Sequence, residues 1–315
     1  MIKAYVHGIY PRSEALVAAT RDLDRGRTTA EAVSELLDKD LEELVQLQQE
    51  AGLDYFSDGL LRWQDLFRPL LEACPGLKAG ALVRWFDNNT FYRAPEEHGD
   101  ISFDGSLAAQ YDTAGVVPQP RVATLPSPLL FSRIAVARGS ANDLMREVAA
   151  GLLRPVADSL VEQGYELIQL QEPWLTFHGI DNGDWKHFEE SVGLVTEGLG
   201  ATTVLHTYFG DAAPWADRLR ELPVDAVGID FFETDLRSLG SGWSKGVLVG
   251  AVNGRRSNME PVEEIVKLAR MVSDTLTPPA LYLGPIADLE LLPRDLAAEK
   301  VRRLGRAAGS LREEA

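Results

Sequence analysis

Cysteine is almost absent from this chain of 315 residues, in which Cys74 is the one thiol. A single cysteine excludes an intrachain disulfide and a zinc site built from several cysteines. Because Cys74 comes directly before a Pro-Gly pair, we interpret it as an incidental buried residue and not as a nucleophile.

Long apolar runs are missing as well. Stretches such as Gly246–Val252 and Ala280–Leu283 are only as long as a strand, whereas a helix that spans a bilayer needs about 20 apolar residues. The first residues, Met1–His7, lack the basic region, long apolar stretch and cleavage site of a signal peptide, and they predict a strand instead. We therefore expect a soluble protein of the cytoplasm.

Basic residues are in the minority, since 31 Lys and Arg face 48 Asp and Glu and the formal net charge is −17. A charge of this sign repels phosphate backbones and anionic lipid surfaces, so the expected partners include no nucleic acid and no membrane. The acidic residues lie mainly in stretches that predict helices, where a solvated outer face is the ordinary explanation. A small-molecule substrate remains the expected ligand, and the oligomeric state is left open.

The pattern of the chain predicts an α/β fold, because short apolar or β-branched runs alternate with amphipathic helical stretches. A length of 315 residues suits one (β/α)8 (TIM) barrel of about 250 residues with insertions, so we expect a single catalytic domain over residues 1–315. Nine runs compete for eight strand positions: Ile2–His7, Asp54–Asp58, Ala81–Phe86, Val122–Leu125, Leu167–Gln171, Thr202–Tyr208, Ala226–Asp230, Gly246–Val252 and Ala280–Leu283.

The run at Ala81–Phe86 is the one that we expect outside the barrel, because a long polar insertion around residues 88–120 follows it. We predict that this insertion passes over one mouth of the barrel. The expected helices are Thr28–Ala51, Ala141–Gly164, Trp185–Leu199, Pro214–Glu221, Pro261–Thr275 and Arg294–Leu311.

Polar residues stand at or just after the ends of the predicted strands, which is where barrel enzymes carry their chemistry. Any one of them could instead cap the helix that follows, which is equally common for Asp and Asn. Together they predict a polar site at one mouth, formed by His7, Asp58, Asp87, Glu172, His206, Asp230 and Asn253.

Seven segments resemble, in the same order, motifs of the cobalamin-independent methionine synthases. They are Gly8–Arg12 (GIYPR), Trp85–Tyr92 (WFDNNTFY), Ile168–Pro173 (IQLQEP), Thr207–Asp211 (TYFGD), Gly228–Asp230 (GID), Gly250–Arg255 (GAVNGR) and Leu289–Arg294 (LELLPR). The resemblance covers nearly the whole chain and implies a barrel of the methionine synthase/UROD-like kind.

The resemblance also implies a zinc site, which the family builds from an H-x-C pair, a Glu and a second Cys. His206 stands at the position of the histidine, but Tyr208 replaces the first cysteine and Ala287 the second. Asp230 falls at the position of the glutamate. The site that the resemblance implies has therefore lost both of its thiolates.

Imidazole and carboxylate ligands with open positions are typical of mononuclear non-haem iron, so we favour Fe(II) as the divalent metal, with Zn(II) as the alternative. The expected ligands are His7, His206 and Asp230, and Glu172 is the other candidate for the third ligand. A metal-free site, like the half of long methionine synthases that lacks the cysteines, is the remaining possibility.

The candidate catalytic residues are Glu172, Asp87 and Tyr208. Gln171 stands where the family has an aspartate that helps to hold a substrate amine, so the lost charge favours a neutral polar substrate. Aromatic faces, amides and two arginines supply the expected substrate-binding set, which is Arg12, Asp58, Trp85, Asn88, Asn89, Trp174, Asn253 and Arg255.

Three functions remain open, and we favour an iron oxygenase that acts on a small heterocyclic metabolite. The second is a zinc methyltransferase of the methionine synthase type, with homocysteine or another thiol as acceptor. The third is a non-catalytic barrel that binds a folate or another pterin, or that assists a separate catalytic subunit. Barrel loops diverge while the scaffold persists, so the fold alone does not decide among them.

Overall fold

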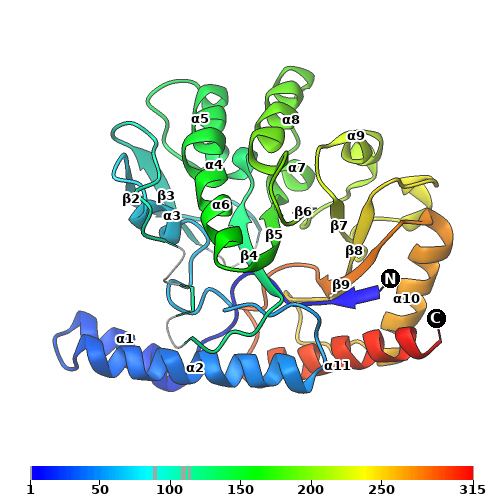
Figure 1. The fold of residues 1–315 in the computed structure, drawn as a ribbon, viewed down its shortest axis with the longest axis horizontal. Helices are drawn as coiled ribbons and strands as arrows, with labels where there is room; N and C mark the ends of the chain where they lie inside the picture. Colours follow the sequence, from blue (N-terminus) through cyan, green and yellow to red (C-terminus); the bar gives the residue numbers. More distant parts are fainter. Residues whose placement is uncertain (1, 88–90, 108–110, 113–114, 315) are drawn as a thin grey trace.

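The computed structural model describes residues 2–87, 91–107, 111–112 and 115–314 (Figure 1). Seven parallel strands form one curled sheet with helices around it. The order of the strands across the sheet is β1 (Ile2–Ala4), β9 (Leu281–Pro285), β8 (Gly246–Val252), β7 (Ala226–Asp230), β6 (Thr202–His206), β5 (Tyr165–Gln171) and β4 (Arg121–Pro126).

Residues 55 and 56 close this sheet into a ring. Tyr55 forms a parallel bridge with Tyr5, which follows β1, and Phe56 forms one with Arg121 of β4. The amide of Phe56 donates to Pro120 O at 3.0 Å. The strand expected at residues 54–58 is thus reduced to two bridging residues, and the predicted (β/α)8 barrel is confirmed.

The helices lie outside the strands, and α2 and α11 run along the same side of the barrel (Figure 1). No helix in the described ranges is long and apolar enough to cross a membrane. The helices are α1 (Glu14–Asp24), α2 (Ala30–Glu50), α3 (Arg68–Glu72), α4 (Pro128–Ile134), α5 (Ala141–Val148), α6 (Arg154–Glu162), α7 (Pro173–Phe177), α8 (Asn182–Thr196), α9 (Ala216–Glu221), α10 (Val262–Leu276) and α11 (Arg294–Glu313).

Helix α2 illustrates how the sequence sets these elements. The hydroxyl of Thr29 accepts a hydrogen bond from the amide of Ala32, an N-cap of the kind that contributes about 1 kcal/mol. Leu37, Leu41 and Leu44 recur at helical spacing and are buried against the barrel. The polar face of the helix is left to solvent.

The helix predicted at Ala141–Gly164 contains one turn of π-helix, Ala149–Leu153, between α5 and α6. Within this turn the carbonyl of Gly151 accepts a hydrogen bond from Phe103 N at 2.9 Å. A side chain at residue 151 would collide with the backbone of Ile101, because a methyl group there would lie 2.3 Å from its carbonyl oxygen. The glycine therefore lets the insertion dock against this helix.

Strand β2 (Leu77–Val83) pairs antiparallel with β3 (Tyr92–Glu97) in a separate hairpin beside α3, outside the barrel (Figure 1). The expectation that the run near residues 81–86 is an addition to the barrel is therefore confirmed. In the described part of the insertion, Phe103 N donates to Gly151 O of the helical layer, and Asp112 pairs with Arg121 at 3.2 Å, at the start of β4. These two contacts lie away from the carboxyl ends of the strands, whereas Tyr92 lines the mouth.

The interior of the barrel changes character along the strands. The layer farther from the carboxyl ends of the strands is a packed cluster of Tyr5, Tyr55, Val122, Leu167, Val204, Ala226, Leu248 and Tyr282. Towards the carboxyl ends of the strands, buried polar side chains replace apolar ones. Gly228 makes room there for His206, since a methyl group on it would lie 2.5 Å from Cδ2 of the imidazole.

Candidate functional site

His7 is buried, and both of its ring nitrogens are hydrogen-bonded. Its Nε2 lies 3.0 Å from the carbonyl oxygen of Pro285, which can only accept, so Nε2 carries the proton. Its Nδ1 therefore accepts from the side-chain amide of Gln171 at 3.1 Å. Burial lowers the pKa of His7 to about 4, so the ring is neutral at physiological pH.

Gln171 is oriented by these contacts. Its amide nitrogen donates to His7 Nδ1 and also to Asp288 Oδ1, both at 3.1 Å. Its oxygen, Oε1, is buried and has no hydrogen-bond partner among the described residues. The substitution of an aspartate by Gln171 thus adds a donor that bridges β5 and β1 and leaves one free acceptor.

His206 is fully buried on β6 and is held by a second glutamine. Gln169 Nε2 lies 3.1 Å from His206 Nδ1, and Gln169 Oε1 accepts from the Tyr5 hydroxyl at 2.8 Å. Nε2 of His206 has no partner in the described part of the structure. Burial, and then the neighbouring His7 ring, lower the pKa of His206.

The predicted metal ligands are only partly brought together. The rings of His7 and His206 meet edge to face, with 4.8 Å between their centroids. Across the described ranges, however, no three His, Cys, Asp or Glu side chains lie close enough to hold a metal ion. Asp230 is buried on β7, but it does not complete the expected set with the two histidines.

The positions that hold zinc in the resembling family do not fit zinc here. Tyr208 is a buried phenol whose pKa is raised by burial, so it is neutral, and Ala287 has no donor atom. Nδ1 of His206 is already occupied by Gln169. A structural zinc site needs about four donors and a catalytic one about three, and this mouth does not supply them.

Asp230 ends strand β7 and shapes the turn that follows. Its Oδ1 accepts from Phe232 N at 2.9 Å, while Oδ2 is buried without a partner among the described residues. Burial raises its pKa to about 6. One carboxylate oxygen of Asp230 therefore stabilises the turn after β7, and the other is available to accept a hydrogen bond.

Glu172 has both carboxylate oxygens engaged by the protein. Oε1 accepts from Leu175 N at 2.9 Å and so caps α7, and Oε2 accepts from the hydroxyl of Ser127. Ser127 itself caps α4 by accepting from Leu130 N at 3.0 Å. Glu172 therefore ties together the loops after β4 and β5, and burial raises its pKa to about 7.

The segment Arg84–Asp87, which we call the strap, lies across the mouth. Asp87, a predicted catalytic residue, is largely exposed and pairs with Arg255 at 2.7 Å. The guanidinium of Arg255 also lies 4.8 Å from the centre of the Phe209 ring. The ion pair and this cation–π contact join the strap to the loops after β8 and β6.

Phe86 of the strap is the centre of an aromatic cluster at the mouth. Its ring lies 5.5 Å from Phe209 and 6.4 Å from Trp174, and Trp85 lies 5.8 Å from Trp174. The imidazole of His178 lies 4.2 Å from the Trp174 ring between centroids, with the two planes tilted by 36°. Trp85 and Trp174, both predicted to bind substrate, thus contact each other at the mouth.

These side chains almost fill the mouth. The cavity that remains has a volume of about 10 Å³ and is lined by Tyr92, Tyr208, Phe209, Arg255, Ala287, Asp288, Glu290 and Leu291. Sites for small molecules usually measure about 300–1,000 Å³. A ligand of that size would have to displace the strap or the aromatic rings to enter this cavity.

Two of the predicted substrate-binding residues, Arg12 and Asn253, are used to build loops. Arg12 donates to the carbonyls of Leu61 and Arg62, at 2.6 and 2.7 Å. Asn253 Oδ1 accepts from Arg255 N at 2.8 Å. These contacts are with the protein's own backbone, so neither side chain is presented to the mouth by them.

Asp58 is buried near Asp112 of the insertion. Its carboxylate accepts from Leu60 N at 3.2 Å and interacts electrostatically with Asp112 of the insertion. Burial raises its pKa to about 7. The structure does not bring Asp58 to the two histidines, and the predicted residues Asn88 and Asn89 lie outside the described residues.

Three residues of the site were not predicted from the sequence, namely Tyr5, Gln169 and Asp288. Asp288 accepts from Gln171 and is fully buried, and burial together with neighbouring Glu290 raises its pKa. Gln169 could have been found, because Gln169 and Gln171 alternate on one strand and must share a face. Tyr5 reaches Gln169 over 164 positions of sequence, for which no local signal exists.

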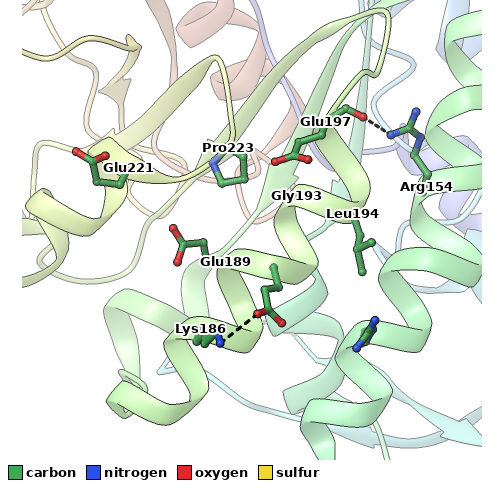
Figure 2. A pocket seen from close by; sticks show the side chains of 10 residues that line it. Arg154, Lys186, Glu189, Gly193, Leu194, Glu197, Glu221 and Pro223 are labelled. Carbon is green, nitrogen blue, oxygen red and sulfur yellow. Dashed lines mark hydrogen bonds and ion pairs between the residues drawn. The ribbon is translucent and has the colours of Figure 1, made fainter.

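A wider groove of about 740 Å³ lies between α6 and α8 on the helical layer (Figure 2). Two of its cationic groups have partners in the protein, since Lys186 Nζ is 3.7 Å from Glu190 and Arg154 donates to Glu197 O at 2.6 Å. None of the residues at the carboxyl ends of the strands lines it. The mouth of the barrel remains the candidate site.

The fold and this mouth define a (β/α)8-barrel protein with buried polar groups at the carboxyl ends of its strands. Residues 74–276, more than half of the chain, match the family model described as cobalamin-independent synthase, N-terminal domain. The chain therefore belongs to the cobalamin-independent synthase family, and the resemblance found in the sequence is confirmed.

Curated relatives agree with this assignment. A methionine synthase of Sulfolobus acidocaldarius is 25% identical over 98% of this chain and 92% of its own length. The 5-methyltetrahydropteroyltriglutamate–homocysteine methyltransferase of Neisseria meningitidis is 28% identical over 70% of this chain. That alignment covers only 29% of the Neisseria protein, which is a much longer chain.

Solved structures share the fold. A B12-independent methionine synthase from Shewanella, in complex with selenomethionine, has a TM-score of 0.77 and 19% identity over 99% of this chain and 98% of its own. A putative vitamin-B12 independent methionine synthase from Listeria monocytogenes also has a TM-score of 0.77, with 15% identity over 99% of both chains. At these identities the likeness establishes the architecture.

The oxygenase prediction is wrong. The relatives that match are named methionine synthase or methyltransferase, and none of those given above is named as an oxygenase. The preference for Fe(II) rested on ligand softness alone, and neither the comparisons nor the geometry of the histidines supports it.

Proposed function

We propose that this chain takes part in the transfer of a methyl group from a methylated tetrahydropterin to homocysteine or another thiol. The observation that carries the proposal is the likeness to a protein named methionine synthase, which extends over 98% of this chain. The name of the Neisseria relative supplies the two substrates, 5-methyltetrahydropteroyltriglutamate and homocysteine. Methyl transfer was the first alternative to the oxygenase.

The mouth suits the donor better than it suits the thiol. A pterin is a flat heterocycle, and Trp85, Phe86 and Trp174 offer aromatic faces at the mouth. Gln171 and His206 add neutral polar atoms beneath them. The strap must move before a ring of this size can enter, because the present cavity is far too small.

Activation of the thiol is the part of the reaction that this mouth does not support. Zinc activates a thiol by holding it as a thiolate, and the family positions that would hold zinc carry Tyr208 and Ala287 here. In our proposal this chain binds the methyl donor, while the thiol is activated on a zinc-bearing barrel of another chain. Glu172 and Asp87 then position loops and the strap.

A second candidate is a complete S-methyltransferase that needs no other chain. The observation in its favour is the extent of the alignment with a relative named methionine synthase. The Sulfolobus protein is matched over 92% of its length by this single chain. His206 and Asp230 would then have to rearrange to bind a divalent metal together with ligands from the substrates.

One assay separates these roles. The protein is incubated with 5-methyltetrahydropteroyltriglutamate and homocysteine, and methionine is measured by mass spectrometry, with zinc or with a chelator. We expect no methionine from the chain alone, and a gain when a zinc-bearing methionine synthase barrel is added. Methionine formed by the chain alone with zinc establishes the second candidate.

Binding of the donor is measured in parallel by calorimetry. The proposal is overturned if the chain neither binds the methylated pterin nor changes the rate of methyl transfer by the added barrel.

A further inference from the structure

Two buried polar atoms without partners lie on neighbouring strands inside the barrel. Gln171 and His206 are aligned in the parallel register of β5 and β6, and both side chains are fully buried. The free atoms are Gln171 Oε1 and His206 Nε2, as far as the described residues show. Buried polar groups are normally hydrogen-bonded, so such a pair calls for a ligand or a water molecule.

The free atom of Gln171 is an acceptor. The carbonyl oxygen of Pro285 takes the Nε2 proton of His7, and His7 Nδ1 must then accept from the Gln171 amide nitrogen. The same nitrogen supplies Asp288 with its second proton. Reversal of the amide would place its oxygen against the lone pair of His7 and against a carboxyl oxygen.

The free atom of His206 is a donor. The Tyr5 hydroxyl has Gln169 Oε1 as its one hydrogen-bond partner in the described ranges, so the Gln169 amide nitrogen faces His206 Nδ1. Nδ1 then accepts, and the proton of the neutral ring resides on Nε2. Reversal of Gln169 would leave the buried Tyr5 proton without an acceptor.

Histidines that bind a metal show the opposite arrangement. Their second ring nitrogen donates its proton to a carboxylate, a carbonyl or water, which frees a lone pair for the metal. At His206 the second nitrogen accepts instead, so a proton occupies the position that a metal ion would need. The Tyr5–Gln169 pair thus holds His206 in the tautomer that has no free lone pair on Nε2 for a metal ion.

We propose that His206 Nε2–H and Gln171 Oε1 together bind a planar amide or lactam group of a ligand. The ligand carbonyl accepts from His206 while the adjacent N–H donates to Gln171. This inference rests on the proposed function only in the choice of the test ligand. The pterin ring of the proposed methyl donor carries such a lactam group. Tyr5 and Gln169 are positioning residues, since they act through His206.

The tautomer is tested first, by nitrogen-15 NMR of the wild-type protein labelled at histidine. We expect His206 as the Nε2–H form without added metal. A ring protonated at Nδ1 overturns the proposal. This readout uses neither a methyl donor nor a thiol, so it is independent of the methyl-transfer assay.

Ligand recognition is tested with two probes, 5-methyltetrahydropterin and its N3-methylated analogue, which lacks the lactam N–H. We expect the analogue to bind at least about tenfold more weakly, which is about 1.4 kcal/mol. Equal binding of the two probes overturns the lactam site even if methyl transfer is observed. A selective site in a protein that fails the methyl-transfer assay leaves this inference standing.

Two variants test the positioning pair. In Gln169→Glu the new carboxylate accepts from Nδ1, so we expect His206 to change tautomer, lose its preference for the lactam probe and gain zinc affinity. In Tyr5→Phe, which retains the shape of the side chain, Gln169 is free to rotate and we expect a mixture of tautomers. Unchanged nitrogen-15 shifts and probe selectivity in folded Tyr5→Phe protein contradict the assignment.

Discussion

Gln171 donates a hydrogen bond to Nδ1 of His7 across the interior of the barrel, at 3.1 Å. This contact joins β5 to the segment after β1, and only a residue with an amide or another donor can make it. The resembling family has an aspartate here, and a carboxylate would face the lone pair of His7 and the nearby Asp288. The neutral amide is therefore a requirement of this particular mouth.

The Gln171→Glu variant tests that requirement. It retains the shape of the side chain but replaces the donor by a buried negative charge, and we expect a loss of about 2–4 kcal/mol in the free energy of unfolding. Urea denaturation at pH 7 measures the change. Gln49→Glu on the exposed face of α2 is the control, and an equal loss in both variants would contradict the proposed role of the amide.

We expect the pair of Asp87 and Arg255 to influence how easily the strap moves away from the mouth. The pair is partly exposed, so it contributes at most about 1 kcal/mol, and Arg255→Ala should unfold at nearly the wild-type urea concentration. We expect association with 5-methyltetrahydropterin to become up to about fivefold faster, because less free energy is needed to move the strap. Stopped-flow fluorescence of Trp85 and Trp174 measures the rate.

The control for this effect is Lys186→Ala, which removes a surface ion pair in the groove between α6 and α8. It should leave the association rate unchanged. If Arg255→Ala binds the probe no faster than this control, the strap is not the barrier to entry.

Gly8 is held in a conformation and a space that suit only glycine. Its φ is +68°, and a methyl group on it would lie 1.7 Å from Asp288 Oδ1. We expect Gly8→Ala to lower the free energy of unfolding by about 2–4 kcal/mol, from backbone strain and steric clash together. Thermal denaturation measures the effect.

Gly26→Ala separates the two causes. Gly26 has a φ of +65° but nothing within 4 Å of an added methyl group, so this variant should lose only about 1–2 kcal/mol. Equal losses of unfolding free energy in the two variants would show that Asp288 makes no steric clash with an alanine at position 8.

Glu172 makes stability depend on pH. Burial raises its pKa to about 7 from an ordinary value of 4.5, so the native state binds its proton more tightly than the unfolded chain. The contribution of Glu172 to stability is therefore full below about pH 4.5 and decreases as the pH rises to 7. The total change is about 3 kcal/mol.

Urea denaturation between pH 4.5 and 8 should show that this slope is reduced in Glu172→Gln. Glu166→Gln, on the exposed side of the same strand β5, is the control and should retain the wild-type slope. The account of Glu172 fails if the two variants have the same pH dependence.

Much of the barrel could be predicted because its strands are continuous apolar runs between helices. Ala226–Asp230 and Gly246–Val252 have the predicted bounds, since every residue in them is buried on both faces of the sheet. The second strand could not be predicted at its true size, because residues 55 and 56 pair only through isolated bridges. Such pairing depends on neighbours that are distant in sequence.

The candidate site was predicted in part. The ends of the strands correctly placed His7 and His206 together, but whether each nitrogen donates or accepts depends on Pro285 and Tyr5. These partners lie at least 164 positions away from the residues that they orient. Local sequence patterns contain no information about such contacts. The prediction of a metal site was therefore made without knowing which histidine nitrogens are hydrogen-bonded.

In our proposal, this mouth binds a methylated pterin without a metal of its own. Calorimetric titration of the chelator-treated protein with 5-methyltetrahydropteroyltriglutamate tests it most directly, with and without added zinc. We expect one binding site whose affinity is the same in both conditions. Binding that appears only when zinc is present, or no binding in either condition, would contradict it.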